Sequence, residues 1–375
     1  MFVHSRAVRY RRMPIEVESP EELGYGAIDC NLAESSFRDQ RLSDLGVEVD
    51  VDELLLAYGD HLGDPDLRAA IASQAGVDPD EVIVTPGAAA ALFLTATSLL
   101  QPGDHAVVLR TNYATNLETP RLLEADLDVL DLHPHDGFAL DLDRLAALLR
   151  PDTALVSLTY PHNPTGTMIG PDQLQAAVDL VEANGTRLLL DETYGDMAYG
   201  ERLPSAAALS ERAVSVSSLS KTYGLPGLRI GWLLCRDAEL RETLLAAKEQ
   251  VLICGATLDE AIAARVLEAR DRLLPPIRDR IAEHRDVVRD WLAGDPAFDW
   301  VEPAGGVVGF PWLADGGVDV ERFYAVLNGD LATYVGPGHW FEQDRRFFRL
   351  GFGWPTTDEL RRGLANLTAA AAAAR

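Results

Sequence analysis

The chain has 375 residues, of which 47% are hydrophobic and 25% are charged, and its formal net charge is −26. This length predicts about two domains, and the composition is globular, which excludes disordered, collagen-like and coiled-coil proteins. The negative charge argues against a nucleic-acid partner, because that binding needs Lys and Arg to meet phosphates. No apolar run is long enough to cross a membrane.

The N-terminal segment and the use of cysteine both bear on the cellular compartment that we expect. Four arginines occur within residues 1–12, but no apolar segment follows them, so we expect no secretion signal. The cysteines Cys30, Cys235 and Cys254 are widely spaced and odd in number, which predicts neither a disulfide framework nor a zinc site. The eight histidines show no metal-ligand spacing, so we expect no metal. A reducing cytoplasm fits best.

Short apolar runs alternate with helical patterns from about residue 65 to residue 270. Most of the runs have four to seven residues and are rich in Val, Ile and Leu, which is typical of strands buried on both faces. Amphipathic segments such as 172–183 and 142–149 separate several of them. This alternation predicts an α/β layered sheet that is mostly parallel. The runs are Glu81–Thr85, His105–Leu109, Leu127–Asp131, Thr153–Leu158, Arg187–Asp191, Ala213–Ser217 and Arg229–Cys235.

The pattern changes after Pro275. Residues 277–292 predict one long helix with a polar face, and a mixed segment with short strands near 307–310 and 346–351 follows. Residues 358–374 predict a final helix that ends in an alanine run. We therefore expect a large α/β domain over 46–270, and a small α+β domain made of 1–45 together with 271–375.

The chain contains only two lysines, Lys221 and Lys248. Lys221 follows a predicted buried strand in the sequence Ser218-Leu219-Ser220-Lys221. Ligands of α/β sheets bind beyond the carboxyl ends of the strands. A partly desolvated lysine at that place has a lowered pKa and can form a Schiff base with a carbonyl. The alternative is a surface charge.

Two further stretches follow predicted strands. Tyr160-Pro161-His162-Asn163-Pro164-Thr165-Gly166 predicts a fixed turn that presents Asn163, or else an ordinary connection between strand and helix. Leu190-Asp191-Glu192-Thr193-Tyr194 places an acid at the end of an apolar strand. Burying that acid is costly without a cationic partner. Asp191 either meets such a partner or caps the next helix.

These three stretches, in this order, resemble the fold-type I aminotransferases that depend on pyridoxal phosphate (PLP), and more narrowly their class I/II branch. The resemblance extends from Tyr58 to Arg349, and it is specific because the SxSK and GxR sequences, NPTG and DExY occur together. It implies the PLP-dependent transferase fold: a mostly parallel seven-stranded sheet in a large domain, plus a small α+β domain.

The resemblance also implies roles at the cofactor. Lys221 would hold PLP as an internal aldimine and move the substrate Cα proton, and Asp191 would keep the pyridine nitrogen protonated. Asn163 and Tyr194 would donate to the phenolic oxygen of the ring. The phosphate would be held by Ser218 and Arg229, with Ser220 as a weaker candidate, and by the turn Gly87-Ala88-Ala89, where backbone N–H groups open a helix. Tyr113 would stack on the ring.

Further roles concern the partner subunit and the substrate. Tyr58 matches a residue that crosses the interface of a homodimer to the neighbouring PLP phosphate. Arg349 matches the arginine that grips the substrate carboxylate, a task that suits its planar fork. The alternatives are a core or rim position for Tyr113 and a surface position for Arg349.

The sequence departs from the family pattern near both ends. Ala33 stands about where the family has a glycine, close to the substrate carboxylate. Glu34 would bind a cationic substrate end or act as an extra base, or it is simply a solvated or paired acid. Residues 336–341 replace a smaller loop, and we expect Trp340 and His339 to line the substrate pocket. These departures concern the substrate rather than the cofactor.

The function implied is amino transfer from an L-amino acid to a 2-oxo acid. The alternative is a PLP-dependent lyase, such as one that eliminates the sulfur substituent of a cysteine conjugate, or a decarboxylating enzyme, an oxidative deaminase or a cyclase of the same fold in a natural-product pathway. A PLP-binding sensor domain without catalysis is a third interpretation. It is disfavoured because regulators of that kind carry a DNA-binding module, for which the segment before Tyr58 has no room.

Overall fold

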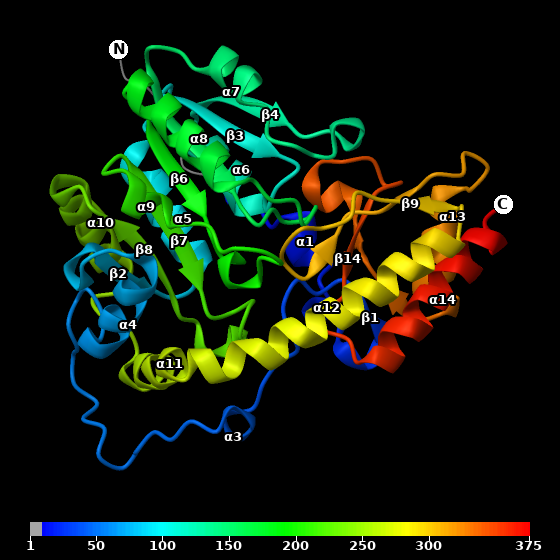
Figure 1. Ribbon diagram of the computed structural model, residues 1–375, viewed down its shortest axis with the longest axis horizontal. Helices are drawn as coiled ribbons and strands as arrows, with labels where there is room; N and C mark the ends of the chain where they lie inside the picture. Colours follow the sequence, from blue (N-terminus) through cyan, green and yellow to red (C-terminus); the bar gives the residue numbers. More distant parts are fainter. Residues whose placement is uncertain (1–9) are drawn as a thin grey trace.

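The computed structural model describes residues 10–375, so Arg6 and Arg9 lie outside the described part of the chain. Its main feature is one seven-stranded sheet with helices on both faces (Figure 1). The strand order is β2-β8-β7-β6-β5-β3-β4, and only β8 runs antiparallel to its neighbours. The strands are β2 (Val82–Thr85), β3 (His105–Arg110), β4 (Asp126–Asp131), β5 (Thr153–Thr159), β6 (Arg187–Asp191), β7 (Ala213–Ser218) and β8 (Gly231–Cys235). All seven predicted strands, and the mostly parallel sheet, are confirmed.

The apolar runs form strands because both of their faces are buried. In β6, Leu188 and Leu190 belong to the core on one face of the sheet, whereas Leu189 belongs to the core on the other. Successive side chains of a strand point to opposite faces, so a strand covered on both sides must be apolar throughout. The first core includes residues of α6 (Ala114–Leu122), α7 (Leu142–Leu148) and α8 (Pro171–Asn184), and the second includes residues of α5 (Ala88–Leu99) and α10 (Ala238–Val251).

A second region packs around its own core near the C-terminus. It contains the hydrogen-bonded strands β10 (Val308–Gly309), β14 (Phe348–Gly351) and β13 (Gly336–Pro337), and the pair β9 (Phe298–Asp299) and β11 (Trp312–Leu313). The helices are α13 (Val320–Ala325) and α14 (Thr357–Ala373). The predicted strands near 307–310 and 346–351 are therefore present but shorter, and the predicted final helix is present almost in full.

One long helix, α12 (Arg270–Gly294), joins the two regions (Figure 1). It begins seven residues before the predicted helix and contains Pro275 and Pro276 in its interior. Leu273 and Leu274 pack in a core beside the sheet, whereas Ile281 packs in the core of the second region. Anchoring at both ends lets the helix continue through prolines that each remove a backbone hydrogen bond.

The remaining elements lie before α5 or connect the parts described above. The short helices α1 (Pro14–Val17), α2 (Pro20–Leu23) and α3 (Leu42–Leu45) precede α4 (Pro65–Ala75). Further along the chain are α9 (Ala206–Leu209) and α11 (Thr257–Glu268). Within residues 10–375, no helix combines the length and apolar character that a membrane crossing requires.

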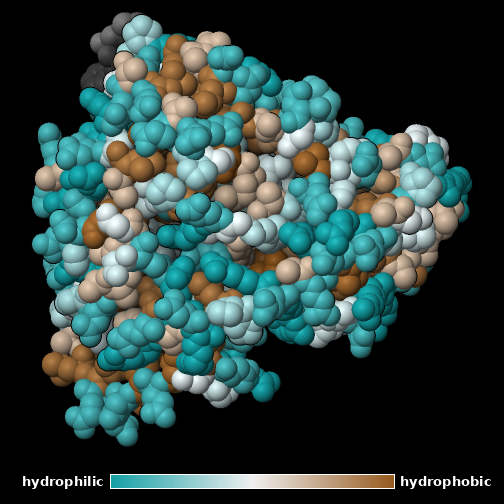
Figure 2. Space-filling view, in the orientation of Figure 1, coloured by the Kyte–Doolittle hydropathy of each residue, from teal (hydrophilic) through white to brown (hydrophobic). Residues whose placement is uncertain are grey.

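The segment between α3 and α4 exposes apolar side chains. Leu55 is 81% exposed, Leu56 is 80% exposed and Tyr58 is 82% exposed. The segment runs along the lower left of Figure 1, and Figure 2 shows apolar atoms at that edge of the molecule. A run of exposed apolar residues of this kind typically marks a contact surface.

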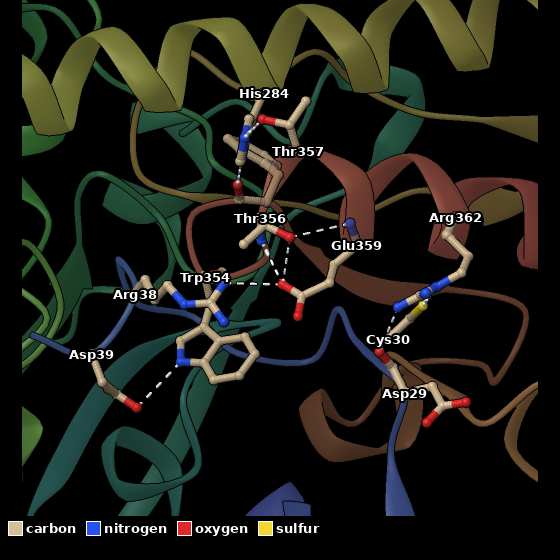
Figure 3. Close-up of polar contacts among 11 residues, drawn as sticks. Asp29, Cys30, Arg38, Asp39, His284, Trp354, Thr356, Thr357, Glu359 and Arg362 are labelled. Atoms are coloured by element: carbon tan, nitrogen blue, oxygen red, sulfur yellow. Dashed lines mark hydrogen bonds and ion pairs between the residues drawn. The ribbon is translucent and has the colours of Figure 1, made fainter.

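The N-terminal segment is tied to the C-terminal helix by polar contacts (Figure 3). β1 (Cys30–Asn31) pairs in parallel with β12 (Thr333–Tyr334). Arg38 forms an ion pair of 2.9 Å with Glu359 of α14, and Arg362 donates to the Cys30 Sγ at 3.1 Å. These contacts support our proposal that the N-terminal segment forms one domain with 271–375, while 46–270 forms the other.

Candidate active site

A cavity of about 450 Å³ lies where the sheet meets the second region. The residues that line it come from the carboxyl ends of β5, β6 and β7, from the start of α5, and from the N- and C-terminal segments. Nearly all of the predicted site residues are among them: Ala33, Glu34, Ala88, Ala89, Tyr113, Asn163, Asp191, Tyr194, Ser218, Ser220, Lys221, Arg229, Trp340 and Arg349. The cavity is therefore the candidate active site.

Lys221 lies three residues beyond the end of β7. Its side chain lines the cavity, and none of the groups in residues 10–375 accepts a hydrogen bond from its amine. Burial lowers the pKa of Lys221 below its usual value, because desolvation disfavours the charged form. A lysine with an unoccupied, more readily neutral amine is suited to form an imine with a carbonyl.

Asp191 ends β6, and its side chain is 7% exposed. Its Oδ1 accepts hydrogen bonds from the Thr193 N–H at 3.0 Å and the Thr193 hydroxyl at 2.6 Å. Burial raises the pKa of Asp191 despite these bonds. The Asn116 side chain and the charge of Lys221 act in the opposite direction to burial. A cationic N–H placed in the cavity would compensate the buried carboxylate further.

Asn163 and Tyr194 bond to groups on the opposite wall. Asn163 Oδ1 accepts from Arg349 Nη1 at 3.3 Å, and the Tyr194 hydroxyl donates to the Ser35 carbonyl at 2.8 Å. Burial raises the pKa of Tyr194 to about 12, so its phenol is neutral at physiological pH. Both side chains line the cavity where the sequence analysis expects them, although each one contacts the second region rather than a ligand.

The predicted phosphate end is built from a helix start and a cation. Gly87 precedes α5 with a φ of +84°, and a side chain there would come within 2.5 Å of the Arg229 guanidinium. Arg229 donates to the Pro226 carbonyl at 2.9 Å and to the Pro86 carbonyl at 3.5 Å, and its exposed side chain lines the cavity. Free N–H groups of a 12-residue helix beside a guanidinium form a favourable place for a phosphate. Ser218 and Ser220 line the same end.

Arg349 lies in β14 on the opposite wall and is 5% exposed. Its Nη2 donates to the Ala33 carbonyl at 2.7 Å. Trp340 and Phe341 lie beside the guanidinium, whose carbon is 5.9 Å from the Trp340 ring centre. These contacts hold the planar fork at the cavity wall, where it can receive a carboxylate.

Three of the residues named in the sequence analysis do not line this cavity. Tyr58 does not line the cavity of its own chain, in keeping with a role in a partner subunit, which stays a prediction. Gly87 supports the wall without lining it. His339 does not line this cavity: its Nε2 bonds to Glu18 Oε2 at 2.8 Å, which turns the ring toward the N-terminal segment.

The sequence analysis missed the N-terminal wall of the cavity. α1, α2 and the residues around them contribute side chains that include Glu16, Glu21 and Glu22. The sequence does contain a helix signal there, since Pro14 and Pro20 each begin a short helix with glutamate in its first turn. Helices of four residues have no apolar periodicity, so pattern analysis does not detect them.

The cavity fits PLP on its own residues. A free amine, a buried carboxylate and a cationic helix start lie around one space, and they complement an aldehyde, a ring N–H and a phosphate. When bound, PLP supplies an electron sink for the bonds at the substrate Cα.

The comparisons with known proteins agree with this geometry. A model of the family described as aminotransferase class I and II matches residues 41–367. The chain is 35% identical to capreomycidine synthase of Streptomyces vinaceus, over 85% of this chain and 82% of that protein. A PLP-dependent aminotransferase from Streptococcus suis has a TM-score of 0.89 at 27% identity, covering 96% of this chain and 97% of its own. A PLP-dependent cyclase has a TM-score of 0.87 at 30% identity, covering 98% and 99%.

Proposed function

Because the chain belongs to the class I and II aminotransferase family and is a PLP-dependent enzyme of fold type I, we propose that Lys221 carries the cofactor and that the enzyme transfers the amino group of an L-amino acid to a 2-oxo acid. The observation that carries this proposal is the free Lys221 amine in the same cavity as Asp191 and Arg349. The three groups correspond to the three tasks of the reaction: proton transfer, cofactor tuning and carboxylate binding.

Each residue has a task that its surroundings support. Arg349 binds the α-carboxylate of the amino acid and thereby orients the Cα–H bond. Lys221 accepts the Cα proton, and its lowered pKa favours the neutral amine that this step needs. Asp191 holds the proton of the ring nitrogen through a charge-assisted hydrogen bond. Asn163 and Tyr194 orient the ring from the side of its phenolic oxygen, while Ser218, Arg229 and the start of α5 hold the phosphate.

We also propose that the enzyme is a cytoplasmic homodimer in which Tyr58 reaches the partner's phosphate. The exposed Leu55, Leu56 and Tyr58 support this, since burial against a second copy would remove apolar surface from water. Light scattering should give the mass of a dimer. Mixing Tyr58→Phe with Lys221→Ala subunits should restore activity in the hybrids if each site uses both chains, and hybrids without activity would contradict a shared site.

A second candidate is β-elimination or ring closure. After the Cα proton is removed, a β-substituent leaves with its bonding electrons, and in ring closure a nucleophilic group of the same substrate then forms a bond to the β-carbon. The similarity to capreomycidine synthase and to a PLP-dependent cyclase favours it. The same Lys221, Asp191 and Arg349 serve this reaction, so the site geometry alone supports both.

One experiment separates the two candidates. The purified holoenzyme is mixed with a panel of amino acids, with no oxo acid present, while the cofactor absorbance and the products are followed. Amino transfer is supported if the absorbance of the lysine-bound cofactor disappears and a 2-oxo acid restores it. Elimination or ring closure is supported if the absorbance persists while ammonia or a cyclic product accumulates over many turnovers.

A further inference from the structure

One wall of the cavity is acidic, and this wall is the part of the site that the cofactor roles do not use. It consists of Glu16 in α1, Glu21 and Glu22 in α2, and Glu34 in the loop after β1. Resting on the proposed function, we propose that the amino acid substrate carries a cation at the end of its side chain, a guanidinium or an ammonium group, and that Glu21 and Glu34 bind it.

The first observation is that most of this charge is unmatched. Glu22 forms an ion pair of 2.7 Å with Arg12. By contrast, Glu16, Glu21 and Glu34 form no ion pair with any Arg, Lys or His of residues 10–375. Neighbouring carboxylates that form no ion pair repel one another, and a cationic ligand relieves that repulsion.

Glu34 has the geometry of a binding residue. Its Oε1 accepts from Asn31 Nδ2 at 3.3 Å and from the Tyr25 hydroxyl at 3.4 Å, while its Oε2 has no partner within residues 10–375. Burial and the charge of Glu21 raise the pKa of Glu34, whereas Lys221 and Arg349 act in the opposite direction. Glu34 and Glu21 line the same cavity as the reacting groups Lys221 and Arg349.

The second observation is the buried Arg349 in the same cavity. Only 5% of this residue is exposed, and its Nε is buried without a hydrogen-bond partner. Arg349 offers the cavity a place for one carboxylate, and Glu21 and Glu34 offer it a place for one cation beyond the α-amino group. The cavity is thus complementary to an amino acid with one negative and two positive charges, and a neutral side chain would leave the acids unpaired.

The segment that carries Glu16, Glu21 and Glu22 is bonded to the C-terminal part of the chain through Glu18. Glu18 lies between Glu16 and Glu21, and its Oε2 accepts from His339 Nε2 and Trp340 Nε1, both at 2.8 Å. The Tyr334 hydroxyl donates to the Glu18 carbonyl at 2.8 Å. Binding residues that are already positioned lose less entropy when they meet a ligand.

The test uses L-arginine and L-citrulline, which have similar shape but differ in the charge of the side-chain end. With the holoenzyme, we expect kcat/KM or its single-turnover equivalent to favour arginine by roughly tenfold to a hundredfold, the range for losing one charge-assisted hydrogen bond. Glu34→Gln and Glu21→Gln should each reduce this preference about tenfold. The matched control is Glu22→Gln, which lines the same wall but is already paired with Arg12 and should keep the preference.

A binding measurement keeps the test independent of turnover. Calorimetry of L-arginine with the Lys221→Ala protein loaded with PLP should show the same loss on adding Glu34→Gln, and unfolding curves should confirm that each variant folds. Equal use of arginine and citrulline, or variants that keep the preference, would overturn the inference while leaving the proposed function intact if neutral amino acids react. If no amino acid of any class reacts, the proposed function fails and the inference fails with it.

Discussion

The two walls of the cavity are built by different means. On the sheet side, Asn163, Asp191 and Lys221 follow three adjacent strands, and the ladder register that aligns Thr159 with Asp191 and Asp191 with Val216 sets their positions. On the opposite side, Arg349 and the acids of α1 and α2 lie on elements of only four residues, and Glu34 lies in a loop. Side-chain contacts between distant parts of the chain hold that wall, such as the one from Arg349 to the Ala33 carbonyl.

This difference suggests a division of labour. Backbone ladders fix the groups that we assign to the cofactor, which must meet one rigid ring. Individual side-chain bonds fix the groups that we assign to the substrate, and such bonds can be exchanged without disturbing a sheet. Substitutions on the sheet wall should therefore affect the chemical step, and substitutions on the other wall should affect binding or local stability.

The sharpest test is Lys221→Ala on the sheet wall. Turnover should fall by roughly 10³-fold or more, because the variant loses both the covalent anchor and the base. Borohydride reduction of the native holoenzyme followed by mass spectrometry should find the cofactor mass on the Lys221 peptide. The other lysine, Lys248, is fully buried and donates to the His61 carbonyl, so its peptide serves as the internal control. Cofactor mass on the Lys248 peptide would refute the assignment.

Asp191→Asn removes a charge but keeps the shape of the side chain. We expect turnover to fall roughly 10²-fold, since a charge-assisted hydrogen bond is lost. The neighbouring acid gives a matched control: Glu192 accepts from the Ser215 hydroxyl at 2.6 Å and from the Ala206 N–H at 2.8 Å. Glu192→Gln should thus lower the free energy of unfolding rather than turnover, and the reverse pattern would break the comparison.

The buried His162, which follows β5 on the sheet wall, should make the free energy of unfolding depend on pH. Burial lowers its pKa from 6.5 to about 4, so the unfolded chain takes up a proton below about pH 6.5 while the native state does not. The free energy of unfolding should therefore decrease by about 3 kcal/mol as the pH falls from 6.5 to 4. His162→Gln should remove this part of the slope in denaturant titrations. The exposed His135→Gln should leave the slope unchanged, and equal slopes in all three proteins would contradict the prediction.

Arg349→Lys probes the second wall. The charge stays but the planar fork is lost, so KM for the amino acid should rise roughly tenfold while kcat changes less. Steady-state kinetics with a saturating oxo acid gives both constants. Arg345→Lys, a partly exposed neighbour that stacks on Tyr324, is the control and should leave KM unaltered. A fall in kcat alone would place Arg349 in the chemical step.

The smallest effect is expected at Thr356, which caps α14 through a reciprocal arrangement with Glu359. The Thr356 hydroxyl lies 2.8 Å from Glu359 Oε2. Thr356→Ala should lower the free energy of unfolding by about 1 kcal/mol and leave kcat unchanged. Urea titration and initial rates measure the two quantities. A tenfold loss of kcat would show that this region contributes to the chemical step.

The comparison also explains what could be predicted from the sequence. The seven strands and the residues at their carboxyl ends could be predicted, because burial on both faces leaves an apolar run and catalysis leaves a motif at its end. Arg349 could be assigned only through the family resemblance. Glu18 and the acids of α1 and α2 could not be predicted, since their importance depends on partners such as Trp340, more than 300 positions along the chain.

The antiparallel direction of β8 determines the path of the connection that carries Lys221 and Arg229. Because β8 runs antiparallel to β7, the connection between them leaves and re-enters the sheet at the carboxyl end of β7. Lys221 and Arg229 both lie in this connection. If β8 were parallel to β7, it would begin at the opposite end of the strands. The residues before it would then lie about 17 Å from the end of β7, the length of a five-residue strand. The connection thus needs only the 12 residues between Ser218 and Gly231. An insertion in this connection would move Lys221 away from Arg229. Transfer of the whole connection into another protein would carry both residues together.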